Sequence, residues 1–366
     1  MKIPVFKTEQ WMTEHEKNVM FNMTDTCVPT LSLKELTMMD DSRLLDDVIL
    51  DYGEITGDTR LKEEILKMYK KGTIENITLD HGCLHADEIV MQTLLESGDK
   101  VVSFTPGYQQ FTDYPKSIGC EVIEIPLIEE NGWQPDLEMF KQAMKSEIKM
   151  IILNNPSNPT GTYLKGNALE QLITLAKKQE TYILADEVYL DYRDGVSISD
   201  LYEKGISTNS LSKMYGLAGI RLGWIKASKE VIDLINLRRD YSFISTGPLV
   251  DTLALVAFHH IDTLLDKGKK VIEENKKIIS EFLKENTNFH LEVPEEGTVS
   301  FLQYDDDISS EELALGLLEK YSVFYVPGSC FGKENHLRLS FTHDPKKLKT
   351  GLELTAKYLN ELNIQK

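Results

Sequence analysis

The sequence contains few cysteines, and those it has form no pattern. Cys27, Cys83, Cys120 and Cys330 are scattered over 366 residues without a CxxC pair. Zinc sites and disulfide frameworks need cysteines at short, recurring spacings, so we predict neither a metal site nor a disulfide. A reducing compartment, the cytoplasm, fits this cysteine usage best.

Long apolar runs and excess positive charge are missing as well. No segment approaches the roughly 18 apolar residues that a membrane span needs, and the N-terminal residues carry charges from Lys2 onward, unlike a signal peptide. With 40 Lys and Arg against 59 Asp and Glu, the net charge is −19, which repels nucleic-acid phosphates. We therefore expect a soluble protein that binds neither membranes nor nucleic acids.

What is present has the composition of an ordinary globular protein, 41% hydrophobic and 27% charged. Up to about residue 260, short β-rich runs alternate with amphipathic helical stretches such as 60–71 and 85–97, a pattern typical of α/β proteins. The expected strands are apolar throughout, as in a sheet covered on both faces. They span residues 100–104, 120–125, 149–153, 181–185 and 206–209.

The chain is longer than one core usually supports, because single cores stop growing at roughly 250 to 300 residues. Beyond about residue 260, long charged helices at 264–285 and 346–362 flank short strands at 299–303 and 336–341. We predict a large domain over residues 41–260, with a mostly parallel, seven-stranded-type sheet sandwiched by helices. A smaller α+β domain would cover residues 261–366, and the N-terminal segment 1–40 would pack with it.

A lysine with polar neighbours follows the expected strand 206–209. Ser210, Ser212 and Lys213 come directly after this strand, and Arg221 follows in a glycine-containing stretch. A lysine amine forms imines when it can lose its proton, which a neighbouring cation or a dry pocket favours by lowering its pKa. The hydroxyls and the guanidinium are donors that suit a phosphate dianion. Taken alone, the same residues also fit an ordinary polar loop.

Two further motifs follow neighbouring strands, where an open parallel sheet places its binding site. Asp186 ends the strand 181–185, and a buried carboxylate there needs a cation such as the pyridinium of pyridoxal 5′-phosphate (PLP). Tyr189 follows closely and could hydrogen-bond the phenolate oxygen of the same ring. Asn158 lies between two prolines after the strand 149–153 and could aim an amide at that oxygen. A helix cap and a sharp turn are the alternative readings.

These three motifs, in this order and at these separations, resemble those of fold-type-I PLP-dependent enzymes of the class I/II aminotransferase superfamily. The resemblance extends over nearly the whole chain from about residue 50. It implies PLP as the cofactor, Lys213 as the Schiff-base lysine and Asp186 as the partner of the pyridine nitrogen. It further implies phenolate donors and phosphate ligands, namely Asn158, Tyr189, Ser210, Ser212 and Arg221.

The resemblance assigns further positions. Cys83 and Leu84 lie in a segment resembling the phosphate-binding turn before a helix, although the family usually offers a Ser or Thr hydroxyl there. Tyr108 corresponds to the aromatic residue that stacks on the pyridine ring. Tyr52 corresponds to a tyrosine that reaches the phosphate in the neighbouring subunit, which would require a homodimer. Arg338 corresponds to the arginine that binds the substrate α-carboxylate, for which a planar guanidinium is suited, and Asn158 is assigned to substrate binding as well.

The resemblance favours an aminotransferase that acts on an α-amino acid with a keto acid as acceptor, and Lys213 would be the general base at Cα. A lyase for C–S or other eliminations is an alternative. The N-terminal segment is atypical and carries four acids, Glu9, Glu14, Glu16 and Asp25, which could face a cationic side chain. It thereby resembles PLP enzymes that cyclise or oxidise arginine derivatives. A PLP-binding regulator is a further alternative.

Overall fold

The structure, a computed structural model, describes residues 2–40 and 45–365. The first two thirds of the chain contain these strands: β2 (Ile77–Asp80), β3 (Lys100–Thr105), β4 (Glu121–Ile128), β5 (Gln134–Pro135), β6 (Met150–Asn154), β7 (Tyr182–Asp186), β8 (Gly205–Ser210) and β9 (Gly223–Lys226). Within the described residues they form one eight-stranded sheet in the order β2-β9-β8-β7-β6-β3-β4-β5. Neighbours from β8 to β4 pair in parallel, whereas β9 pairs antiparallel with β8 and β2, and β5 with β4.

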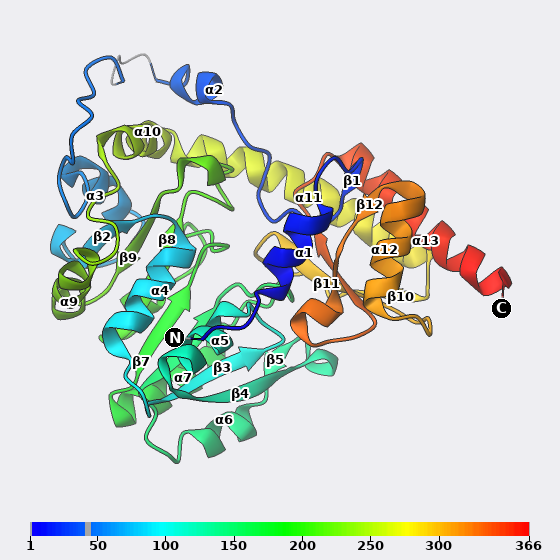
Figure 1. Cartoon of the computed structure of the whole chain (residues 1–366), viewed down its shortest axis with the longest axis horizontal. Helices are drawn as coiled ribbons and strands as arrows, with labels where there is room; N and C mark the ends of the chain where they lie inside the picture. The colour runs from blue at the N-terminus through cyan, green and yellow to red at the C-terminus, as the bar shows by residue number, and fades with distance from the viewer. Residues whose placement is uncertain (1, 41–44, 366) are drawn as a thin grey trace.

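Helices cover both faces of this sheet (Figure 1). They are α3 (Thr59–Leu66), α4 (Cys83–Leu94), α5 (Gln110–Ile118), α6 (Leu137–Ala143), α7 (Gly166–Gln179), α8 (Ile198–Leu201), α9 (Lys229–Arg239) and α10 (Pro248–His259). Because side chains alternate along a strand, Met150 and Ile152 of β6 pack in a core cluster with α4, α5 and α9, whereas Ile151 and Leu153 pack with α6, α7 and α8. The predicted α/β class and mostly parallel sheet are confirmed, and the two-residue β5 adds an eighth strand.

The last third of the chain forms a smaller antiparallel sheet with its own helices. Its strands are β10 (Phe289–His290), β11 (Val299–Tyr304), β13 (Val326–Pro327) and β14 (His336–Ser340), in the order β10-β11-β14-β13. The helices are α11 (Ile261–Glu285), α12 (Ser310–Tyr321) and α13 (Pro345–Gln365). Short 3₁₀ turns occur in both parts of the described chain: η1 (Ile74–Asn76), η2 (Glu129–Asn131) and η3 (Ala218–Ile220) in the large part and η4 (Gly328–Phe331) in the small part.

The N-terminal segment contacts both parts of the molecule. It contains α1 (Lys7–His15), β1 (Phe21–Asn22) and α2 (Leu33–Thr37), and β1 pairs with β12 (Val323–Phe324). Trp11 of α1 donates its indole N–H to the carbonyl of Tyr325 at 2.9 Å, while the backbone N–H of Lys7 donates to Gln109 of the large part. Helix α1 thus lies between the two sheets (Figure 1). The boundary expected between residues 40 and 41 adjoins 41–44, which lie outside the described residues.

Helix α3 is shorter than the pattern over 60–71 predicts. Its last residue is Leu66, and the chain continues in turns. Tyr69 in these turns is buried and accepts a hydrogen bond from the indole N–H of Trp224 at 2.8 Å, so tertiary packing overrides the helical periodicity. No single described helix is long and apolar enough to cross a membrane; α10 and α11 meet that test only together, across a bend of 71°.

Candidate active site

A cavity of about 320 Å³ opens at the carboxyl ends of β6, β7 and β8. Three loops bring polar residues to it, because parallel strands end at the same edge of the sheet. Strand β14 and the N-terminal segment close the other side. The expected site residues that line it are Cys83, Leu84, Tyr108, Asn158, Asp186, Tyr189, Ser210, Ser212, Lys213, Arg221 and Arg338. Tyr52 does not line this cavity, and its side chain is 65% exposed on the surface.

Asp186 is the last residue of β7 and is 6% exposed. Its carboxylate accepts hydrogen bonds from the thiol of Cys83 at 2.9 Å and from the backbone N–H of Val188 at 3.0 Å. Burial raises the pKa of Asp186 to about 6, although these hydrogen bonds and the charge of Lys213 act in the opposite direction. The Cys83 side chain therefore faces Asp186, and only the backbone of the turn is left to serve an anion.

Lys213 follows β8 and is held by the N-terminal segment. Its amine donates to the hydroxyl of Thr26 at 2.6 Å and lies 3.8 Å from the sulfur of Cys27. The backbone of the two segments is also joined, because the N–H of Val28 donates to the carbonyl of Lys213 at 3.0 Å. A segment nearly 190 residues away in sequence thus fixes the lysine.

The electrostatic surroundings of Lys213 correct one sequence expectation. Burial lowers the pKa of its amine, as expected for a dry pocket, and Arg338 acts in the same direction. Tyr189, Cys27 and Asp25 outweigh these effects, so the pKa of Lys213 lies above its ordinary value. The amine of the cofactor-free protein is therefore protonated at neutral pH.

The turn before α4 is shaped for an anion. The N–H groups of a first helical turn have no partner within the helix and carry the positive end of its dipole. Gly82 adopts φ +84°, and a Cβ there would lie 2.6 Å from a guanidinium nitrogen of Arg221, so glycine permits this close approach. Together with the hydroxyls of Ser210 and Ser212, this donor set fits the phosphate of PLP.

Arg338 on β14 is a buried cation with neutral partners. It is 2% exposed and donates to the hydroxyl and carbonyl of Thr24 at 2.8 and 3.1 Å, and to the side-chain oxygen of Asn158 at 3.4 Å. No ion pair in the described part of the chain includes it. A buried guanidinium without a carboxylate partner is costly, and it suits a carboxylate ligand.

Three of the four N-terminal acids line the same cavity: Glu9, Glu16 and Asp25. Glu9 accepts a hydrogen bond from the hydroxyl of Tyr108 at 2.9 Å, and Glu16 accepts one from Asn22 at 2.7 Å. Neither these two nor Asp25 pairs with a basic side chain among the described residues. Glu14 lies on the same helix but is exposed and does not line the cavity.

The sequence analysis gave no role to the other lining residues. They are Met12, Thr26, Asp87, Asn154, Val188 and Ala218. Asp87 could have been noticed, because it is the only acid on the otherwise apolar buried face of α4 among the described residues. Thr26 has no local signal, since its contact with Lys213 depends on how the N-terminal segment folds back.

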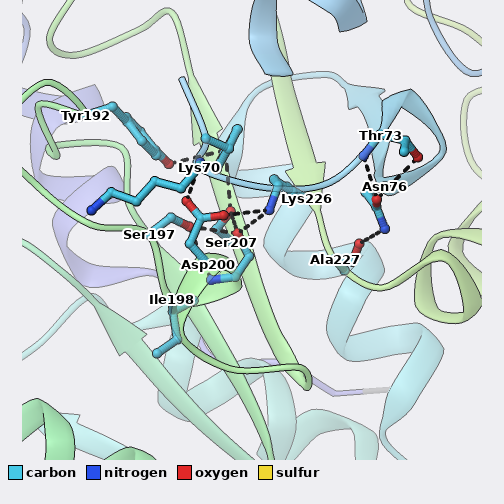
Figure 2. A network of polar contacts seen from close by, with 12 residues as sticks. Lys70, Thr73, Asn76, Tyr192, Ser197, Ile198, Asp200, Ser207, Lys226 and Ala227 are labelled. Carbon is cyan, nitrogen blue, oxygen red and sulfur yellow. Dashed lines mark hydrogen bonds and ion pairs between the residues drawn. The ribbon is translucent and has the colours of Figure 1, made fainter. Parts of the chain in front are cut away.

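A polar network includes Tyr192, Ile198 and Asp200, which follow β7, and Lys226 of β9 (Figure 2). Glu187 accepts hydrogen bonds from the hydroxyl of Tyr192 at 2.6 Å and from the backbone N–H of Ile198 at 2.7 Å. Burial raises the pKa of Glu187 to about 7. Nearby, Lys226 and Asp200 form an ion pair of 3.2 Å whose side chains are both 4% exposed. These contacts fix the position of the residues that follow β7.

The sequence matches the family model "Aminotransferase class I and II" over residues 29–354. The chain belongs to this family. Pyridoxal 5′-phosphate is therefore its cofactor, and the resemblance identified from the three motifs is confirmed. The match begins after the segment that carries the N-terminal acids.

Individual relatives carry different names. Capreomycidine synthase of Streptomyces vinaceus is 25% identical over 98% of this chain and 94% of its own length. Aspartate aminotransferase of Pyrococcus horikoshii is 28% identical over 84% of this chain and 82% of its own length. The structure of a PLP-dependent aminotransferase from Streptococcus suis has a TM-score of 0.95 at 35% identity and 99% coverage of both chains. The structure of the PLP-dependent cyclase OrfR has a TM-score of 0.90 at 23% identity, and the match covers 99% of this chain and 98% of the OrfR chain. This similarity shows a shared fold.

Proposed function

We propose that this protein uses PLP to transform an α-amino acid with a positively charged side chain. One observation carries the proposal: a buried guanidinium, Arg338, and the carboxylates Glu9, Glu16 and Asp25 face one cavity. The guanidinium suits the α-carboxylate of the substrate. The acids have no basic partner among the described side chains, and they suit a cation.

In this proposal the large sheet holds the cofactor. Lys213 would hold its carbonyl group, Asp186 would serve as the partner of the pyridine nitrogen, and Asn158 and Tyr189 would be donors to the phenolate oxygen. Tyr108 would stack on the ring, while the first turn of α4, the hydroxyls of Ser210 and Ser212, and Arg221 would hold the phosphate. When bound, the ring supplies an electron sink for the bond broken at Cα. The raised pKa of Asp186, about 6, still leaves its carboxylate ionised at neutral pH and able to pair with a pyridinium.

The remaining side chains of the cavity orient the amino acid and move its proton. The amine of Lys213 would be the base that removes the Cα proton of the bound amino acid. Arg338 fixes the carboxylate, so that the Cα–H bond points toward this amine. Helix α1 contributes Glu9 and Met12 to the wall of the cavity.

Transamination to a keto acid is the first candidate reaction, as the family implies. Ring closure on a cationic side chain is the second. A specific observation favours it: the acids lie before residue 29, outside the family match, whereas the similarity to capreomycidine synthase spans 98% of the chain. Both reactions need the same recognition of a carboxylate at one end and a cation at the other.

Single turnovers would test the proposal. The PLP-loaded protein is incubated with arginine, ornithine or lysine, and in parallel with alanine or leucine, without a keto acid. Accumulation of pyridoxamine 5′-phosphate indicates transamination, whereas a dehydrated or cyclised product that retains all substrate nitrogen indicates ring closure. Release of ammonia with a keto acid would indicate a lyase, and oxygen uptake an oxidase. Reaction with the neutral amino acids alone would refute the cationic substrate.

We also propose that the protein is a homodimer in which Tyr52 of the partner subunit completes the phosphate site. Tyr52 lies in an exposed stretch with Ile49 and Leu50, whose side chains are 72% and 80% exposed. Contiguous exposed apolar residues favour a protein contact. Light scattering would give the mass in solution, and Tyr52→Phe should weaken PLP binding while the dimer persists.

All four cysteines are free thiols, in keeping with a cytoplasmic location, which remains part of the proposal.

A further inference from the structure

Helix α4 buries one carboxyl group in apolar surroundings. Asp87 is 1% exposed and lies one helical turn after Cys83. The other buried residues of the helix after Cys83 are apolar: Ala86, Ile89, Val90, Met91 and Leu94. No basic side chain forms an ion pair with Asp87 in the described part of the chain. Burying an unpaired carboxyl group costs stability, which points to a role in the site that it lines.

The surroundings of Asp87 leave one of its oxygens free. The hydroxyl of Thr208 donates to one carboxyl oxygen at 2.6 Å. The other oxygen, Oδ2, is buried and has no hydrogen-bond partner among the described residues. The sulfur of Cys83 and one oxygen each of Asp87 and Asp186 lie within 4.8 Å of one another. Two carboxyl groups therefore stand side by side at the pyridine end of the cavity.

We propose that Asp87 is a positioning residue that keeps its proton and donates a hydrogen bond to the Asp186 carboxylate, so that the pair presents one negative charge to the cofactor nitrogen. No proton is released or consumed in forming this pair. The inference goes beyond the function proposed above, but it rests on the role given there to Asp186.

The charges around the pair favour this distribution of the proton. Two close buried carboxyl groups cannot both ionise cheaply. Burial and the charge of Asp186 raise the pKa of Asp87 well above its ordinary value, and Asp80 adds to this effect. Asp186 keeps a lower pKa, because the Cys83 thiol and the Val188 N–H donate to it and Lys213 lies near. The proton therefore resides on Asp87.

The nearby titratable groups do not change this assignment. Burial raises the pKa of the Cys83 thiol, so it stays protonated as a donor. The carboxylate of Asp80 is paired with His85, whose ring nitrogen Nδ1 lies 2.5 Å from the Asp80 oxygen Oδ1. The hydroxyl of Thr208 fills one side of Asp87, which leaves Oδ2 as the atom that can turn to Asp186.

Cofactor binding to variants of the two acids tests the proposal. Asp87→Asn keeps a donor of the same shape, and we expect its dissociation constant for PLP to stay within about three-fold of wild type. Asp87→Leu removes the donor, and we expect PLP binding about ten-fold weaker, the factor for one hydrogen bond to a charged group. The cofactor-free Asp87→Leu protein should unfold at the same or a higher temperature, because leucine extends the apolar buried face of α4 and removes a buried carboxyl oxygen that has no partner among the described residues.

The contrary outcomes are distinct. Unchanged PLP binding by Asp87→Leu would overturn the proposal, and so would a parallel loss of stability and binding, which indicates a purely structural residue. Asp186→Asn separates the two assignments. If it too binds PLP like wild type, the role of Asp186 is wrong, whereas weakened binding in Asp186→Asn alone removes only the inference about Asp87.

Infrared spectroscopy provides a test that needs no leucine variant. At pH 8.5 Asp186 and Glu187, with pKa values of about 6 and about 7, are ionised, whereas a protonated Asp87 still gives a carboxylic acid band. We expect this band in cofactor-free wild type and in Glu187→Gln, and its loss in Asp87→Asn. Absence of the band from wild type would overturn the proposal.

Discussion

The cavity has two walls that originate differently. The proposed cofactor wall, formed by Asn158, Asp186, Tyr189 and Lys213, stands on consecutive strand ends of a single sheet. The proposed substrate wall, formed by Arg338 and the N-terminal acids Glu9, Glu16 and Asp25, is assembled from segments far apart in sequence. Arg338, for example, is held by Thr24, 314 positions away. The first wall lies within the family match and most of the second lies outside it.

This difference separates what the fold provides from what the individual chain adds. A parallel sheet with polar strand ends positions a ring and a phosphate whatever amino acid is bound. The N-terminal acids lie outside that sheet, because the one strand of their segment, β1, pairs with β12 and not with a strand of the large sheet. Substrate choice should therefore respond to the substrate wall alone.

The largest effect is expected at Lys213. Lys213→Ala removes the proposed covalent anchor and the Cα base, and we expect turnover to fall by at least about 10³-fold, within the range for general base catalysis. The absorbance of the lysine-bound cofactor should disappear as well. Lys229→Ala, an exposed lysine paired with Asp233, is the control. If the absorbance of the lysine-bound cofactor persisted in Lys213→Ala, the assignment of Lys213 as the cofactor-binding lysine would be wrong.

Arg338→Lys tests the shared part of the substrate wall. The substitution replaces a planar guanidinium, which can bind a carboxylate through two hydrogen bonds, by a single ammonium group. The kcat/KM for any α-amino acid should therefore fall by about 10²-fold, as expected for weakened charged hydrogen bonds. The absorbance spectrum of the bound cofactor should not change. Amines that lack a carboxylate would react equally with both proteins. A loss that is equal for amines and amino acids would show that Arg338 does not bind the carboxylate.

The N-terminal acids should show a smaller and more selective effect. Glu16→Gln and Glu9→Gln each remove one charge, and we expect about a ten-fold rise in KM for a cationic amino acid, the size of one partly desolvated charge interaction. Neutral amino acids should be affected less than two-fold. Glu14→Gln on the same helix is the matched control, because Glu14 is exposed. Equal effects at positions 14 and 16 would mean that the acids act only through net charge.

The same contrast explains what the sequence could predict. The apolar strands and the polar residues that follow them are local features, so β3, β6, β7 and β8 and their motifs could be placed from the sequence. Thr26 could not, because its contact with Lys213 joins distant segments; Asp87 has a local signal on α4, but its place beside Asp186 depends on contacts between distant segments. Lys213 has one feature of each kind. Its position follows from a local motif, whereas its raised pKa results from Tyr189, Cys27 and Asp25, which the fold brings around it.

The smallest effect on turnover is expected behind the cofactor wall, at Glu187. Because its folded pKa, about 7, exceeds its ordinary value of 4.5, the folded state holds this proton between those pH values while the unfolded state has lost it. Its contribution to stability is therefore complete below pH 4.5 and is lost as the pH rises through 7. The loss amounts to about 3 kcal/mol at most, from the size of the pKa difference.

Glu187→Gln removes this titration. The free energy of unfolding of wild type relative to the variant should decrease from pH 5 to pH 8, as measured by denaturant titration at both pH values. Glu203→Gln, an exposed acid on the following loop, should show no such change. Because Glu187 contacts Tyr192 and Ile198 rather than the cavity, the preference for cationic over neutral amino acids should stay within about two-fold of wild type, well below the ten-fold effect of one charge interaction. A changed preference would mean that the network behind Asp186 reaches the substrate wall, and the two walls would then not be independent.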